Sequence, residues 1–139
     1  MVSREDGSGT RGAFIELFGI EEKNDAGEKI DMTTEDAEIT NSTSVMMTTI
    51  SGNTEAIGYI SLGSLNDTVK AVKIDGAEAT VDNIKSGAYK IARPFNIATK
   101  AEVSEVAADF IKYIMSEQGQ KVVEEMREHM KLLVFLERL

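Results

Sequence analysis

The sequence predicts an α/β fold, in which a mixed sheet is flanked by helices and the C-terminal third is helical. Two segments, Ala56–Ser64 (AIGYISLGS) and Val69–Ile74 (VKAVKI), have the β-branched and alternating composition of strands. Val103–Met115 repeats its apolar residues at spacings of three and four, which is typical of an amphipathic helix. Strands that alternate with helices along one chain favour the α/β class.

Two further helices are predicted in the first half of the chain. Arg11–Ile20 carries its apolar side chains on one face, with Gly19 as a stop signal. The acidic stretch Glu21–Lys29 (EEKNDAGEK) then indicates an exposed loop. A polar cluster at Asn41–Thr43 precedes an apolar run that is closed by Gly52, so we expect a short capped helix between them.

The second half of the chain continues this alternation. Thr80–Gly87 (TVDNIKSG) reads as one short helix with a threonine cap and a glycine stop. Tyr89–Thr99 is strand-like, and Pro94, the only proline, marks an edge, a bulge or a crossing point because it cannot donate to a ladder. After a break at SEQGQ, Lys121–Leu139 is predicted to resume as helix.

Length and composition exclude several classes of function. The 139 residues suit one folded domain, and a net charge of −9 repels phosphate backbones, so no nucleic-acid partner is expected. The absence of cysteine excludes disulfides, zinc–thiolate sites and thiol catalysis, and the only histidine, His129, lies in a charged segment. We therefore expect no metal and no cofactor. Neither a transmembrane helix nor a signal peptide is predicted in this chain.

The segment Arg4–Arg11 (REDGSGTR) directly precedes the first predicted helix and is the main candidate for a binding site. A helix N-terminus leaves backbone N–H groups without partners and carries a partial positive charge. Glycines let the backbone approach a ligand, and a hydroxyl at Ser8 or Thr10 would cap the helix and add a donor. The Arg4 guanidinium matches a tetrahedral oxyanion through two parallel hydrogen bonds, and Asp6 is placed to hold it.

A simpler interpretation of the same residues stays open. Serine, threonine, aspartate and glycine before an apolar run are typical of any helix start. No Lys–Ser/Thr pair follows the glycines, which argues against a nucleotide P-loop. Catalysis by Ser8 is disfavoured because no general base is identifiable beside it. The residues alone therefore leave two alternatives, a helix cap and an anion site, without enzymatic activity.

Ordered blocks along the chain add a family resemblance. The blocks SREDGSGTRGAF, AIGYISLGSL, VKIDG, IKSGAYKIARPFNI and FIKYIMSEQGQKVV resemble the second half of the substrate-binding proteins of phosphate ABC transporters. Such proteins belong to the type II periplasmic-binding-protein class, with phosphate clamped between two lobes. The resemblance implies that residues 1–93 form a phosphate-binding lobe and that residues 94–139 return to a first lobe outside this chain. It runs from Val2 to Glu125, and the tail beyond departs from the family pattern.

The resemblance also implies roles for individual residues. In the family, the matching arginine, serine, glycine and threonine donate to phosphate, and the aspartate buttresses the arginine. These roles fall on the donors Arg4, Ser8, Gly9 and Thr10 and on the supporting residues Asp6 and Gly7. The family's acceptor for the phosphate proton belongs to the other lobe. We therefore expect this chain alone to bind phosphate weakly and to discriminate poorly against sulfate.

The resemblance implies inorganic phosphate binding, as part of the receptor of an ABC importer. The implied partner is the transporter permease, and the implied location is extracytoplasmic, either periplasmic or as a cell-surface lipoprotein. Alternatives are a receptor lobe for another oxyanion such as sulfate or molybdate, a non-catalytic interaction module, and an enzyme that uses Ser8 on phosphoesters. The apolar tail at Leu132–Leu136 also suggests self-association.

Overall fold

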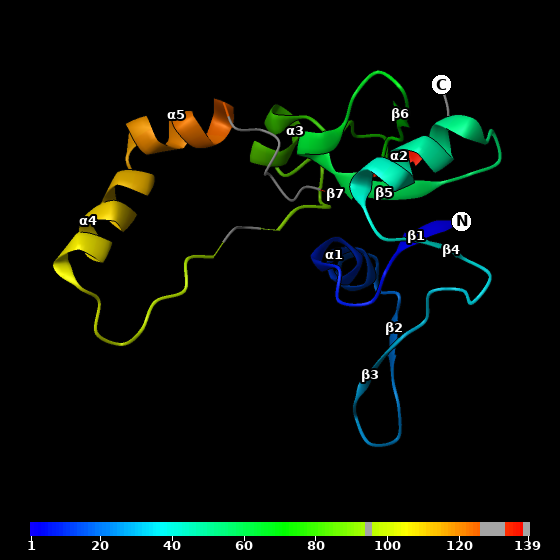
Figure 1. The fold of residues 1–139 in the computed structure, drawn as a ribbon, viewed down its shortest axis with the longest axis horizontal. Helices are drawn as coiled ribbons and strands as arrows, with labels where there is room; N and C mark the ends of the chain where they lie inside the picture. Colours follow the sequence, from blue (N-terminus) through cyan, green and yellow to red (C-terminus); the bar gives the residue numbers. More distant parts are fainter. Residues whose placement is uncertain (94–95, 126–132, 138–139) are drawn as a thin grey trace.

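The computed structural model describes residues 1–93, 96–125 and 133–137, which form small sheets packed with helices (Figure 1). In chain order the elements are β1 (Val2–Arg4), α1 (Gly9–Phe18), β2 (Glu21–Lys23), β3 (Lys29–Asp31), β4 (Glu38–Thr40), α2 (Thr43–Gly52), β5 (Gly58–Ser61), the 3₁₀ helix η1 (Leu62–Ser64), β6 (Lys70–Ala71), α3 (Val81–Lys85), α4 (Glu105–Ile114), α5 (Glu117–Glu125) and β7 (Leu133–Glu137). The two helices predicted in the first half of the chain are confirmed as α1 and α2, with ends within two or three residues of those expected.

The structure combines parallel and antiparallel strands with helices, which confirms the predicted α/β class. Strands β1 and β4 are parallel, with Arg4 opposite Thr40. The backbone N–H of Val2 donates to the carbonyl of Ile57 at 2.8 Å, which links β1 to the residue just before β5. Beyond it, β7 lies between β5 and β6 and is antiparallel to both. The site described below therefore rests on a parallel pair of strands, which one backbone hydrogen bond joins to an antiparallel three-stranded sheet.

Strand β5 divides the core into two parts. Ile60 is buried with Met46 and Ile50 of α2 and with Val2 of β1. The preceding residue, Tyr59, is buried on the other side with Phe14 of α1. Successive side chains of a strand point to opposite faces, so α1 and α2 cover opposite sides of β5, as their positions in Figure 1 show.

The predicted exposed loop at Glu21–Lys29 is a β-hairpin instead. Strands β2 and β3 pair antiparallel, with Lys23 opposite Lys29, and their side chains remain largely exposed. The side-chain oxygen of Asn24 accepts from the backbone N–H groups of Ala26 and Glu28, and Gly27 has a φ of 80°. Asparagine and glycine at these positions close a tight turn, and this turn chemistry outweighs the polar composition.

Two of the later predictions are wrong in part. The expected strand at Tyr89–Thr99 is not a strand in its described residues, and Pro94 lies outside them. The predicted helix at Lys121–Leu139 is confirmed only for Lys121–Glu125, which belong to α5, a helix that begins earlier at Glu117. Leu133–Glu137 forms strand β7 instead, and residues 126–132 lie outside the description. A strand requires backbone partners, and the edges of β5 and β6 supply them to β7. Tyr89 and Ile91 nevertheless bury their side chains in the core.

The C-terminal helices α4 and α5 pack against each other and extend away from the sheets (Figure 1). A Cβ at Gly119 would collide with the carbonyl oxygens of Tyr113 and Ile114, so only glycine permits this close turn between the helices. Large apolar side chains of α4 are exposed, including Val106 at 81% and Phe110 at 62%. Among the described residues, every helix is too short or too polar to cross a bilayer.

The core around α2 gives a direct test of this packing. Ile50 is 0% exposed and contacts the cluster beneath β1 and β5. We expect Ile50→Ala to lower the free energy of unfolding by about 2–5 kcal/mol, because it leaves a cavity. Val45 lies on the same helix but is 45% exposed, so Val45→Ala should change the free energy by less than about 0.5 kcal/mol. Urea unfolding followed by circular dichroism measures both values.

Candidate anion-binding site

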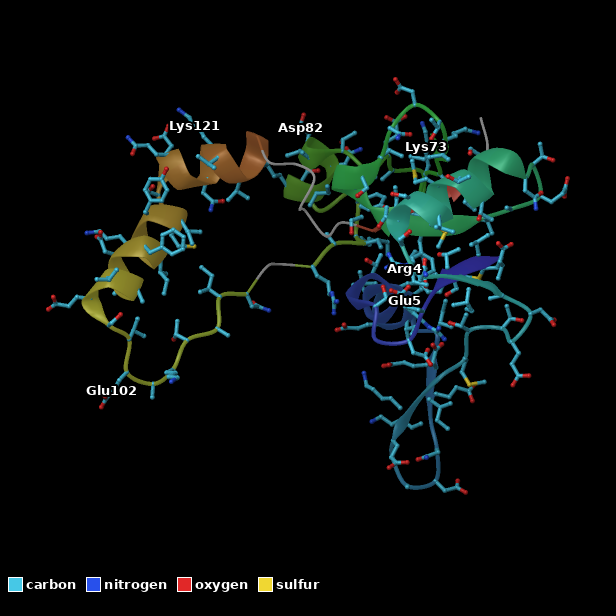
Figure 2. The ribbon with its side chains drawn as sticks, viewed as in Figure 1. Arg4, Glu5, Lys73, Asp82, Glu102 and Lys121 are labelled. Atoms are coloured by element: carbon cyan, nitrogen blue, oxygen red, sulfur yellow. The ribbon has the colours of Figure 1, made fainter. Side chains whose placement is uncertain are left out.

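The candidate site lies where the parallel strands β1 and β4 end. Each strand is followed by a helix, and α1 begins at Gly9 while α2 begins at Thr43. Because parallel strands end at the same edge of a sheet, both helix N-termini lie near that edge, where ligands bind in many open α/β sheets. Figure 2 shows Arg4 and Glu5 at this edge, next to α1.

The loop between β1 and α1 has a defined backbone geometry. Gly7 has a φ of 81°, a conformation that other L-residues adopt only with strain, and Ser8 N–H donates to the carbonyl of Glu5 at 3.2 Å. Ser8 is the N-cap, since its Oγ accepts from Arg11 N–H at 3.4 Å. Of the two expected caps, Ser8 and Thr10, the structure therefore selects Ser8.

Capping leaves the donors of this loop available to a ligand. A serine hydroxyl that accepts one hydrogen bond still has its own proton to donate. Gly9 and Thr10 are the first two residues of α1, and N–H groups at these positions have no intrahelical acceptor. Ser8 and Thr10 are half-buried and Gly9 is exposed. The helix cap and the anion site are therefore compatible uses of the same residues.

A buried tyrosine positions the start of the loop. The hydroxyl of Tyr59 lies 2.7 Å from Ser3 Oγ and accepts from Arg4 N–H at 3.2 Å. Its ring stacks on Phe14 of α1 at a centroid distance of 4.3 Å. Thr40 adds a second link, since its Oγ1 donates to the carbonyl of Ser3 at 3.1 Å. The backbone of Arg4 is thus held from β5, α1 and β4.

The side chain of Arg4 has an acidic partner other than the predicted one. Its Nε and Nη2 donate to the two carboxylate oxygens of Glu5 at 2.8 and 2.9 Å. Asp6 lies 2.9 Å from Nη1 of Arg11 instead. The prediction that Asp6 holds Arg4 is therefore wrong in this structure, because Glu5 occupies the guanidinium edge that Asp6 would need. The Arg4 hydrogen bond, helped by the Glu5 backbone amide, lowers the pKa of Glu5.

Thr43 is a second contact that sequence reasoning missed. Nη1 of Arg4 donates to Thr43 Oγ1 at 3.4 Å, and the Arg4 side chain is only 12% exposed. The sequence predicts Thr43 only as part of a helix cap. Its approach to Arg4 depends on the parallel pairing of β1 with β4, which the sequence does not predict. Thr43 also lines an uncharged, hydroxyl-rich cavity of about 410 Å³ between α2 and the segment around Asn66.

In the described residues, no cluster of three carboxylate or histidine side chains could hold a metal ion.

Comparison with known proteins places this chain and its fold in a family. The family model described as the PBP superfamily domain matches residues 1–118, and the chain belongs to this superfamily. Phosphate-binding protein PstS 2 of Streptococcus agalactiae is 66% identical over 125 residues, which cover 89% of this chain and 43% of that protein. Its counterpart in Streptococcus pneumoniae is 51% identical over 123 residues. The chain thus spans less than half the length of these relatives.

Solved structures give the same result. A phosphate-binding protein of a phosphate ABC transporter from Streptococcus pneumoniae superposes with a TM-score of 0.83 at 49% identity, over 91% of this chain and 49% of that one. An ABC-type phosphate transport receptor from Vibrio cholerae superposes with a TM-score of 0.78 at 34% identity, over 90% of this chain and 50% of that one. The resemblance to substrate-binding proteins of phosphate ABC transporters is confirmed.

Removal of one buried hydroxyl tests how the loop is anchored. Tyr59→Phe keeps the stacked ring but deletes the hydroxyl bonded to Ser3 Oγ and Arg4 N–H. We expect it to lower the free energy of unfolding by about 1–3 kcal/mol, because buried polar atoms lose a partner. Tyr113 is 48% exposed on α4, so Tyr113→Phe is the matched control. Equal stability of the two variants would contradict this anchoring role.

The acidic partner of Arg4 can be identified by its titration. The pKa of Glu5 lies below its ordinary 4.5, so the Arg4–Glu5 pair stabilises the folded chain above pH 4.5 and is lost as the pH falls through the lower folded value. In Arg4→Ala, the NMR titration midpoint of the Glu5 carboxyl should rise toward 4.5. Lys73→Ala is the control, since it should raise the pKa of Glu78 and leave that of Glu5 unchanged.

Proposed function

We propose that this chain is the phosphate-binding lobe of the receptor of an ABC phosphate importer. The single observation that carries this proposal is the loop from Arg4 to Thr10, which lies at the edge where the two helix N-termini follow β1 and β4. The names and structures of the relatives support phosphate as the ligand. The lobe works by binding without catalysis, and the intact receptor acts outside the cytoplasmic membrane with a permease as its partner.

Each residue of the loop contributes a different donor to the bound phosphate. Arg4 supplies the positive charge, with the Nη1 and Nη2 protons that its contacts with Glu5 and Thr43 leave over. Ser8 and Thr10 supply hydroxyl protons. The N–H groups of Gly9 and Thr10 supply the helix-terminus site. Gly7 supports this arrangement through its left-handed backbone, while the supporting role of Asp6 runs through Arg11.

The division of the chain follows from the same proposal. Residues 1–93 form the phosphate-binding lobe, and the helices α4 and α5 that follow reach toward the remaining part of the receptor. Strand β7 departs from the expected division at residue 94, because it pairs with β5 and β6 of the lobe. The exposed apolar side chains of α4, such as Val106 and Phe110, support this second assignment because they are suited to burial against another surface. The other part of the receptor supplies the acceptor for the phosphate proton. Without it, the lobe binds phosphate weakly and discriminates poorly.

An anion titration tests the proposal. Addition of inorganic phosphate to the ¹⁵N-labelled chain should shift the amide signals of residues 7–11 in a saturable way. Arg4→Ala should weaken this binding by about tenfold or more, since a charge-assisted hydrogen bond is worth about 1.5–3 kcal/mol. Lys121→Ala, on α5 far from the loop (Figure 2), should leave the titration unchanged.

The alternatives give different results in the same experiments. Tighter binding of sulfate or molybdate than of phosphate in competition would assign the lobe to another oxyanion. Turnover of a chromogenic phosphoester that disappears in Ser8→Ala would indicate an enzyme. An absence of saturable shifts in the wild-type chain would leave an interaction module whose loop only caps α1, and the proposal would be wrong.

A further inference from the structure

Arg11 connects three separate segments around the candidate site. It is the third residue of α1, and its side chain is 16% exposed. Its Nε and Nη2 donate to Oδ2 of Asp31, at the end of β3, at 2.9 and 2.7 Å. Its Nη1 donates to the backbone carbonyl of Arg4 and lies beside the carboxylate of Asp6, each at 2.9 Å. One guanidinium therefore joins α1, the loop from Arg4 to Thr10 (the anion loop) and the β2–β3 hairpin.

These contacts hold the anion loop at three points. The Arg4 carbonyl is at the start of the loop, Asp6 is in its middle, and the backbone N–H of Arg11 closes its end through the Ser8 cap. A guanidinium is planar and presents fixed donors in several directions, whereas an ammonium is a single point charge. The arrangement depends on the shape of the arginine side chain as well as on its charge.

Asp31 links the loop to a hairpin that extends away from the sheets (Figure 1). Partial burial of this carboxylate opposes ionisation, but hydrogen bonds from Thr33 and Arg11 outweigh it and lower the pKa of Asp31. The backbone N–H of Thr33 donates to its other oxygen at 2.7 Å. Asp31 is therefore an ionised and oriented partner, and its contact with Arg11 connects the hairpin to the loop.

The geometry points to Arg11 as a positioning residue for the anion site. It holds the loop from Arg4 to Ser8 in its donor-presenting shape without contacting the anion, and Asp31 fixes it in place. This inference rests on the proposed phosphate-binding function. It extends that function to the β2–β3 hairpin, whose contact with Arg11 then contributes to the affinity of the site.

Two variants separate positioning from simple electrostatics. Asp31→Asn removes a negative charge near the anion loop, so an effect of charge alone would tighten phosphate binding. Arg11→Lys keeps the positive charge, so charge alone would leave binding unchanged. If Arg11 acts by positioning, both variants should raise the dissociation constant for inorganic phosphate by about threefold or more, since small losses of geometry are costly. The double variant should be no weaker than Arg11→Lys.

The matched control lies in the same hairpin. Glu21 pairs with Lys29 across β2 and β3, so Glu21→Gln alters an ion pair of the hairpin without touching Arg11. It should leave the phosphate titration unchanged. Tighter or unchanged binding in Asp31→Asn would overturn the inference.

The link between hairpin and loop can also be measured without phosphate. Asp31→Asn should shift the amide signals of residues 6–10 in the ligand-free chain, although these residues lie more than twenty positions away in sequence. Glu21→Gln should not shift them. If the wild-type chain binds no phosphate but these shifts occur, the proposed function fails and the positioning role stands. If phosphate binds but the shifts are absent, the positioning role fails alone.

Discussion

Strands β1 and β4 lie parallel, with Arg4 opposite Thr40, and both helices that follow them begin at the same edge. The anion loop, the position of the Arg4 guanidinium and its contact with Thr43 all depend on this pairing. Tyr59 stabilises strand β1, because its buried hydroxyl is hydrogen-bonded to both Ser3 and Arg4. A parallel pair of three residues per strand thus determines where the donors of the site converge.

The site works against the overall charge of the molecule. At a net charge of −9 the chain repels anions at long range, so any anion must be held by local donors. The two acidic residues that follow Arg4 divide between two arginines, Glu5 with Arg4 and Asp6 with Arg11. Each carboxylate is matched to a guanidinium, which limits repulsion while the N–H and hydroxyl groups of the loop stay available. Ser8 combines the cap of α1 with a free hydroxyl proton.

The sequence predicts correctly those helices whose capping contacts join residues close in the chain. The cap at Thr80 is predicted directly, while the caps at Ser8 and Ser42 are each one of two or three candidates that the sequence offers. The sequence does not predict the hairpin at Glu21–Lys29, because its polar turn residues fit an exposed loop equally well. The tail strand β7 was read as a helix because apolar composition does not reveal which edge is free to pair.

The sequence by itself determined the α/β class, the presence of a helix behind the REDGSGTR segment and the family resemblance, because each depends on residue types at short spacing. Tertiary structure decided which acid partners which arginine, that Thr43 reaches Arg4, and that Asp31 joins the site through Arg11. These contacts join residues that only strand pairing and helix packing bring together. Whether Glu5 or Asp6 pairs with Arg4 depends on distances and directions in the folded loop, and the order of residues in the sequence does not specify these.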